Sequence, residues 1–299
     1  MLTIFTTAKP FKGHFGMIQR NALKSWSLLR PTPQIILFGS EEGSAEVAAE
    51  LNITRVEDVE RNEFGTPLIS SMFSLAQKLS PNPLLCYVNA DIMLTRQFIE
   101  GLRAVAVQKS QFVMTGRRTL VNVDKPWDFD RPDWEDALHR YATAQGKLDV
   151  WVGMDYFAFP RGAYPDIPPF AVGRVRWDNW MIYSARRRGV PVVNATHDVQ
   201  VVHQNHDYSH LAGGEMECVT GPEGLRNKEL AGTQNYFCIA DSTYLLKNGR
   251  LSRALEPIYL WRRLHTLPVL YPIFTPVRWL LSIPLWITRP LRRRLGWKF

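Results

Sequence analysis

The amino-acid sequence predicts an α/β fold in which a mixed, mainly parallel sheet is flanked by helices. Short runs of apolar strand formers alternate with segments whose apolar residues recur at helical spacing, a pattern typical of parallel sheets with right-handed crossovers. In addition, the apolar run that begins at Leu84 ends in Asn89-Ala90-Asp91. Open α/β sheets place ligand-binding carboxylates at strand ends, so this stretch indicates both the fold and its site.

The first half of the chain predicts a regular alternation of strands and helices. Strands are expected at residues 2–7, 34–38, 54–56 and 84–88, and helices at 15–29, 44–51 and from Thr66 to about Leu79. Thr66 is the expected N-cap of that last helix, with Pro67 at its first helical position.

The second half continues the alternation with longer polar connections. Helices are expected at residues 96–108, 132–144 and 178–188, and strands at 112–115, 150–159, 190–193 and 199–203. Residues 122–131 are polar and irregular, and the chain contains no internal repeat.

The net charge of +8 is concentrated at the C-terminal end of the 299 residues. Residues 250–299 hold ten Lys or Arg and one acid, Glu256, which gives +9, so the remaining 26 basic and 27 acidic side chains sum to −1. This distribution excludes a nucleic-acid-binding fold, in which basic residues spread over the folded part. Three cysteines without CxxC spacing, and a start that lacks a signal-peptide pattern, indicate a reducing, cytoplasmic location.

The C-terminal segment suggests contact with a membrane. It mixes tryptophans, aliphatic residues and arginine clusters, and five prolines after Pro257 interrupt it, at positions 268, 272, 276, 284 and 290. The apolar run at 279–288 is ten residues, whereas a spanning helix needs roughly 20. We therefore expect a catalytic domain at 1–249 and a membrane-associating tail at 250–299, with 257–299 on an anionic surface and the protein peripheral on the inner face of the membrane. The alternative is a tail that packs back on the domain.

Two acidic residues are the main candidates for chemistry. Asp91, at the end of a buried strand, is expected to ligate Mn²⁺ or Mg²⁺; the alternative is an Asp that only caps a turn. Asp178 lies between Trp177 and Trp180 at a helix start. It could act as a general base beside an apolar platform for a sugar ring, or serve only as an N-cap.

Two further stretches carry polar residues at strand ends. Asp155 interrupts the apolar run that follows Gly153, and it is either a sugar contact or a structural ion pair with Arg174 or Arg176. The segment from His203 to Tyr208 follows the last expected strand. A neutral imidazole there could complete a metal shell or bind phosphate, although a single histidine is more often structural.

With these four stretches in this order, the chain resembles the GT-A glycosyltransferases. Asn89-Ala90-Asp91 resembles their DxD motif, with Asn in place of the first Asp. Trp177-Asp178-Asn179-Trp180-Met181 resembles their xED element without its Glu. The resemblance implies Asp178 as the base of an inverting enzyme and Asp91 with His203 as metal ligands. It also implies nucleotide contacts at Thr6, Thr7, Lys9, Asn62, Thr66 and Asn89, and sugar or acceptor contacts at Gly153, Asp155, Trp177, Asn179, Trp180 and His206.

The activity implied by the resemblance is transfer of a sugar from a UDP- or GDP-linked donor to an acceptor hydroxyl, with Mn²⁺ or Mg²⁺ as cofactor. A lipid-linked or cell-envelope glycan is the acceptor that a membrane-bound enzyme of this kind would use. Two alternatives remain. One is a catalytically inactive, glycan- or lipid-binding relative. The other is a sugar-phosphate nucleotidyltransferase. Such enzymes usually begin with a Gly-rich loop that carries Arg and Lys, and residues 6–16 of this chain do not contain that pattern.

Overall fold

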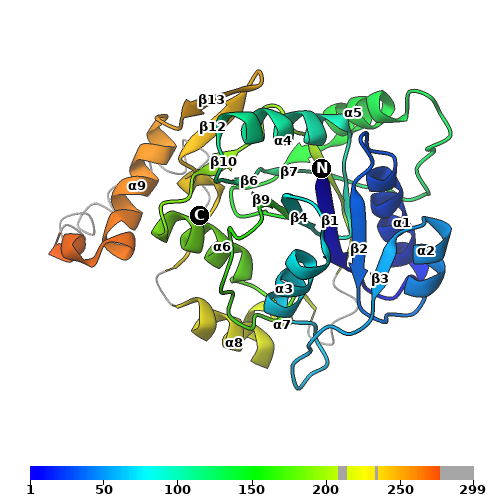
Figure 1. Cartoon of the computed structure of the whole chain (residues 1–299), viewed down its shortest axis with the longest axis horizontal. Helices are drawn as coiled ribbons and strands as arrows, with labels where there is room; N and C mark the ends of the chain where they lie inside the picture. The colour runs from blue at the N-terminus through cyan, green and yellow to red at the C-terminus, as the bar shows by residue number, and fades with distance from the viewer. Residues whose placement is uncertain (208–213, 233–234, 277–299) are drawn as a thin grey trace.

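The computed structural model describes residues 1–207, 214–232 and 235–276. These residues form a nine-stranded sheet and a four-stranded sheet, with helices on both faces of the larger one (Figure 1). The predicted α/β class, with a mixed, mainly parallel sheet flanked by helices, is therefore confirmed.

The larger sheet has the strand order β13-β12-β10-β6-β9-β4-β1-β2-β3. Parallel pairing joins β3, β2, β1 and β4 in turn, and also joins β6, β10 and β12. β9 is antiparallel to both of its neighbours, β4 and β6, and β13 is antiparallel to β12. The strands are β1 Leu2–Thr7, β2 Gln34–Phe38, β3 Thr54–Val56, β4 Leu84–Val88, β6 Val113–Thr115, β9 Tyr156–Pro160, β10 Val192–Asn194, β12 Tyr244–Lys247 and β13 Arg250–Arg253.

The smaller sheet has the order β5-β11-β7-β8 and lies beside the ends of the larger one. It contains β5 Ile92–Met93, β7 Arg118–Val121, β8 Lys147–Leu148 and β11 Val201–Gln204. β11 is antiparallel to β5 and parallel to β7. Because β5 follows β4 after a three-residue turn, this sheet brings the end of β11 to the end of β4.

Helices follow most strands, as the alternation predicts. In the described residues they are α1 Gly13–Ser27, α2 Ser44–Glu50, α3 Ile69–Leu79, α4 Arg96–Gln108, α5 Trp134–Gln145, α6 Trp177–Arg187, α7 Glu215–Thr220, α8 Pro222–Ala231 and α9 Pro257–Leu270, with short 3-10 turns η1 Ile239–Asp241 and η2 Pro272–Phe274. The expected helices at 96–108 and 178–188 agree with α4 and α6 within one residue. The sequence pattern did not predict α7, α8 or α9.

Alternation along the strands builds one hydrophobic core on each face of the larger sheet. Ile4 of β1 packs with residues of α1 and α4, and its neighbour Phe5 packs on the other face with residues of α3 and α6. Successive side chains of a strand point to opposite faces of the sheet, so neighbouring residues enter different cores. The sheet is therefore held rigidly between two layers, and its strand ends give fixed positions to the polar residues that follow them.

Two predicted boundaries are wrong. α3 begins at Ile69 with Leu68 as N-cap, not at Thr66, because Leu68 donates its backbone N–H to Glu60 and the segment before it forms a short hairpin. The strand expected at 150–159 starts only at Tyr156. Residues 150–155 instead form a turn whose backbone donates from Gly153 to the carbonyl of Val150.

The globular fold extends further along the chain than the predicted domain boundary. The boundary predicted at residue 250 falls inside the β12–β13 hairpin, and α9 follows with its Ile258 and Tyr259 buried. The globular fold therefore extends at least to Leu270, and residues 277–299 of the predicted tail lie outside the described part of the chain. Within the described ranges, the helices are too short or too polar to cross a bilayer.

Candidate functional site

A cavity of about 670 Å³ lies at the carboxyl ends of β1 and β4. Strand ends, the loops after them and the start of α6 supply its walls, which explains why residues far apart in sequence meet there. Its polar lining includes Thr7 and Lys9 after β1, Thr66 before α3, Asn89 and Asp91 after β4, Arg118 on β7, Asp155 before β9, Arg174 and Asp178 near the start of α6, and His203 and His206 at the end of β11.

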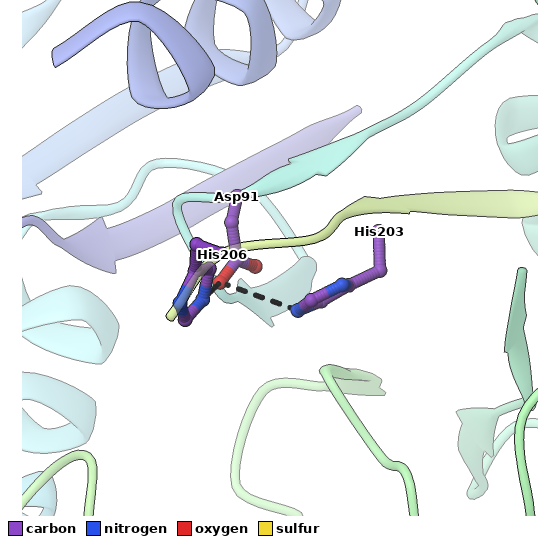
Figure 2. Close-up of side chains that lie close together, drawn as sticks. All are labelled: Asp91, His203 and His206. Atoms are coloured by element: carbon purple, nitrogen blue, oxygen red, sulfur yellow. Dashed lines mark hydrogen bonds and ion pairs between the residues drawn. The ribbon is translucent and has the colours of Figure 1, made fainter. Parts of the chain in front are cut away.

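Asp91, His203 and His206 form a cluster on one wall of this cavity (Figure 2). The antiparallel pairing of β11 with β5 places His203 opposite Ile92, the residue after Asp91. The Nε2 of His206 lies 3.1 Å from Oδ2 of Asp91, and the Nε2 of His203 lies 3.6 Å from the same oxygen. The ligand atoms of the three side chains all lie within 4.8 Å of one another.

The cluster has the properties of a divalent-cation site. The Oδ1 of Asp91 and the Nδ1 of His203 are buried and have no hydrogen-bond partner among the described residues. A buried carboxylate oxygen without a partner is costly unless a ligand satisfies it. One carboxylate and two imidazoles are a donor set that binds first-row divalent ions. The sequence predicted the Asp91–His203 pair, and the structure adds His206, which was expected among the sugar contacts.

The charges of the cluster stabilise each other. Burial of the Asp91 carboxyl opposes its ionisation, but the positive charge of His203 and the hydrogen bond and charge of His206 outweigh it, so the pKa of Asp91 lies well below its usual range. Burial alone would lower the pKa of His206, but the hydrogen bond to Asp91 and its charge raise it. Lys9, nearby, has its pKa lowered to about 8 by burial, although Asp91 opposes this.

Asn89 belongs to a second network on the adjacent wall. Its Nδ2 donates to Oδ1 of Asp155 over 2.8 Å, and its backbone N–H donates to the carbonyl of Asp155. Arg118 donates from Nη1 to both carboxylate oxygens of Asp155, at 2.9 and 2.7 Å, and from Nε to Asp149 at 2.7 Å. Asn89 therefore does not replace a second metal-binding carboxylate. It fixes Asp155, whose ion-pair partner is Arg118 and not Arg174 or Arg176.

Asp178, the residue predicted as the base, has a position and a pKa that suit this role. It lies in the first turn of α6, lines the cavity, and its Oδ1 accepts the backbone N–H of Asn179 over 2.8 Å. Burial raises the pKa of Asp178 to about 6, and the negative charge of Asp155 adds to the increase. A carboxylate with this pKa is ionised at neutral pH and still accepts a proton readily.

The residues around Asp178 hold α6 in place. Trp177 lines the cavity but is only 5% exposed, because its ring packs on Tyr87 and Phe157. Trp180 packs on Phe170, away from the cavity lining. The Nδ2 of Asn179 donates to the carbonyl of Phe237. Asn179 and Trp180 therefore lie in the packing behind the cavity wall.

Some of the nucleotide contacts expected at the N-terminal end line the cavity, and others lie behind its wall. Thr7, Lys9 and Thr66 line the cavity, as do Gly153 and Asp155 of the expected sugar contacts. Thr6 is fully buried and its hydroxyl donates to the carbonyl of Thr7. Asn62 lies behind the lining, where its Oδ1 accepts the backbone N–H of Phe64 and Thr66.

Sequence reasoning missed several charged residues of the site. Arg118 is the clearest case, because nothing in the segment RRTLV marks one arginine as the partner of two carboxylates. Arg174, which lines the cavity, pairs with Glu223 at the start of α8, and Arg61 pairs with Glu41 over 2.9 Å. These pairs join segments far apart in the chain, so spacing along the sequence carried no signal for them.

No protein-family model matches this chain, and no curated protein matches it in sequence. Solved structures similar to it include S. aureus TarS 1–349 in complex with UDP-GlcNAc, at 11% identity and a TM-score of 0.32 over 40% of this chain and 35% of that chain. Another structure of S. aureus TarS is 10% identical, with a TM-score of 0.46 over 68% of this chain and 36% of that chain.

A third similar structure is the mannosyltransferase PcManGT from Pyrobaculum calidifontis, in complex with GDP-Man and Mn²⁺. It is 14% identical, with a TM-score of 0.43 over 99% of this chain and 83% of that chain. The present chain spans 35% and 57% of the two TarS 1–349 structures. Likenesses of this extent carry no inference about what this chain binds or does.

Proposed function

We propose that this protein is a glycosyltransferase that moves a sugar from a nucleoside-diphosphate donor to an acceptor hydroxyl. One observation carries the proposal: a single cavity holds both a divalent-cation donor set and, on another wall, a separate carboxylate with a pKa of about 6. A metal site suits a diphosphate, and a poised carboxylate suits a hydroxyl that must lose its proton. The volume of about 670 Å³ is within the range of small-molecule sites.

Asp91, His203 and His206 are the residues that would hold the cation. Mixed carboxylate and imidazole ligands favour Mn²⁺ over Mg²⁺, which prefers oxygen ligands and retained water. A bound divalent ion supplies positive charge that offsets the charge developing on the departing nucleoside diphosphate. We place the UDP or GDP part of the donor toward Thr7, Lys9 and Thr66 on the cavity wall.

Asp178 is the proposed base. It takes the proton of the acceptor hydroxyl as the oxygen attacks the anomeric carbon of the donor sugar. The bond from the anomeric carbon to the diphosphate oxygen breaks, and its electron pair leaves with the nucleoside diphosphate. This single displacement inverts the anomeric configuration. Asp155, already bound by Arg118 and Asn89, keeps a fixed negative charge near Asp178 and thereby favours its proton uptake.

The test is a panel of UDP- and GDP-sugars, measured for thermal stabilisation and for donor hydrolysis with Mn²⁺, with Mg²⁺ and with EDTA. With Mn²⁺ we expect at least one donor to stabilise the protein against heat and to be hydrolysed slowly. With EDTA we expect neither effect. Asp91→Ala should lose both, and Asp178→Asn should keep donor binding and lose turnover. Asp124→Asn, an exposed carboxylate outside the cavity, is the matched control.

Two results would contradict the proposal. Normal turnover in Asp178→Asn would remove this residue as the base. Metal-dependent donor binding without turnover against any acceptor, a glycan or lipid-linked saccharide included, would make the protein a binding relative.

A further inference from the structure

Helix α9 belongs to the globular fold through one of its faces. Ile258, Tyr259 and Leu270 are buried, and the side-chain amide of Asn194 donates to the Tyr259 hydroxyl over 2.9 Å. Arg262 donates to the fully buried carboxylate of Asp241 at 2.6 to 3.1 Å. These contacts fix the rotation of α9, so its other face points outward at the edge of the molecule (Figure 1).

The outward face is apolar. Leu260 and Leu264, one helical turn apart, are 44% and 48% exposed. Six of the fifteen large apolar side chains that are exposed in the described chain lie within twenty consecutive residues, at Leu255, Leu260, Leu264, Tyr271, Ile273 and Phe274. We call these six residues, two on α9 and four in the segments at its two ends, the α9 apolar face. Soluble surfaces rarely gather apolar side chains in this way without a binding partner.

The charge along this part of the chain is mainly positive. From Leu255 onward the chain has a single acid, Glu256. The sequence that continues from η2, residues 277–299, contains five Arg and one Lys, no acid, and tryptophans at positions 279, 286 and 297. On the described side, Arg253 and Lys109 each lie 4.7 Å over the ring of Tyr244, and the charge of Arg253 reaches Arg263 of α9.

We propose that the α9 apolar face docks on an anionic lipid bilayer, with α9 in the plane of the interface. Exposed leucines on α9, followed in the sequence by a cationic, Trp-containing stretch, match the two attractions that hold interfacial helices, apolar insertion and charge at anionic headgroups. The structure alters the sequence-based expectation, because the buried face of α9 stays in the fold and, among the described residues of this segment, the six outward ones enter the lipid. This docking is independent of the proposed transferase activity.

Co-sedimentation of the full chain with vesicles tests the proposal. Vesicles of phosphatidylcholine with one quarter phosphatidylglycerol are compared with pure phosphatidylcholine. We expect at least about tenfold stronger binding to the anionic vesicles, decreasing with salt. Leu260→Glu with Leu264→Glu should weaken that binding by at least about tenfold, since each change removes an inserted side chain and adds a repelled charge.

The matched control is Leu79→Glu with Val107→Glu. These residues are 43% and 89% exposed, on α3 and α4, so they receive the same chemical change away from the α9 apolar face. The control should bind as the unchanged protein does. Thermal unfolding of both double variants shows that each remains folded.

A fluorophore attached at Ile273→Cys gives a second measurement. The three native cysteines are buried, so a thiol-specific, polarity-sensitive dye should label the introduced residue. Its emission should shift to the blue on anionic vesicles, and the same dye at Val107→Cys should not respond. Three results would overturn the proposal: no preference for anionic vesicles, binding unchanged by the Leu260/Leu264 variant, or a concentration-dependent dimer that this variant disrupts, which would assign the face to a second copy.

Discussion

Asp178 shows how burial prepares a carboxylate for proton transfer at the expense of stability. Its pKa of about 6 lies above the ordinary value of 3.8. Between these pH values the folded chain binds more protons than the unfolded chain, so the contribution of Asp178 to the free energy of unfolding decreases as pH rises through that window. Above about pH 6 the carboxylate is ionised and available as a base, and the destabilisation is complete.

Asp178→Asn should therefore stabilise the protein while abolishing transfer. At pH 8 we expect the free energy of unfolding to increase by about 2–3 kcal/mol, and near pH 4 we expect little difference. Urea unfolding at the two pH values measures this. In the unchanged enzyme the rate should fall as pH decreases through about 6. A variant with unchanged stability at pH 8 would show that Asp178 is not held in a desolvated position.

Arg118 is the residue on which the second network depends. The side chains of Asp155 and Asp149 are only 5% and 14% exposed, and Arg118 is the cation that both contact. Arg118→Met should lower the free energy of unfolding by about 3–5 kcal/mol, because the buried carboxylate of Asp155 and the half-buried one of Asp149 lose their counter-ion. Adding Asp155→Asn should restore part of the loss.

The control for this change is Arg131→Met. Arg131 also pairs with a carboxylate, that of Asp133, but its side chain is 50% exposed. Water and salt screen an exposed pair, so it contributes little to stability and this variant should unfold almost as the unchanged protein does. Equal losses in the two arginine variants would contradict the role assigned to Arg118.

At this scale the sequence identified the residues whose position follows from a strand end or a helix start. Asp91 lies in the turn after β4, His203 lies near the end of β11 and Asp178 lies in the first turn of α6, and the structure places all three at the cavity. Other features depend on side-chain directions in the folded chain, which no spacing in the sequence encodes. They are the partners of Asp155 and the place of His206 in the cluster with Asp91 and His203.

At the scale of helices and strands, local sequence patterns were sufficient to predict some bounds but not strand direction. Helix α4 has the predicted bounds because its apolar residues follow a clear helical period. β9 covers only the second half of the strand expected at 150–159, and it lies antiparallel between β4 and β6. Strand direction depends on the path of the chain between β7 and β9, and the polar, irregular residues 122–131 carry no signal for that path.

Gly101 on α4 gives a test of element packing. Alanine in place of a helical glycine usually stabilises by about 1 kcal/mol, because it restricts the unfolded chain. Here a Cβ would collide with the Cγ2 of Val199 and would lie 3.3 Å from Leu246. Gly101→Ala should therefore destabilise the protein by about 1–3 kcal/mol. Arg103→Ala, exposed on the same helix, should change stability little, and a more stable Gly101→Ala would show that α4 packs less closely than described.

The whole molecule depends on a C-terminal segment that sequence composition assigned to a tail. Composition could not separate α9 from the residues after it, because both are rich in Trp, Leu, Pro and Arg. The contacts separate them: Arg262 pairs with buried Asp241, and the carbonyl of Leu270 accepts a hydrogen bond from Arg187 of α6.

Two truncated chains should consequently behave differently. A chain ending at 276 keeps the buried side chains of α9 and the Arg262–Asp241 pair, so it should unfold cooperatively at a temperature near that of the full protein. A chain ending at 256 removes the partner of Asp241 and the buried side chains of α9. It should lose several kcal/mol of stability or fail to fold. Thermal denaturation followed by circular dichroism compares the two, and similar midpoints would assign α9 to the tail after all.

The Asp91–His206 contact joins residues 115 positions apart in the chain. An ion held by these side chains is a removable cross-link between the two halves of the protein, and it binds only the folded form. Its supply would therefore set how much of the protein survives proteolysis in a cell, as well as how fast each copy works. Depleting the ion should lower the steady-state amount of the native protein and leave Asp91→Ala unaffected.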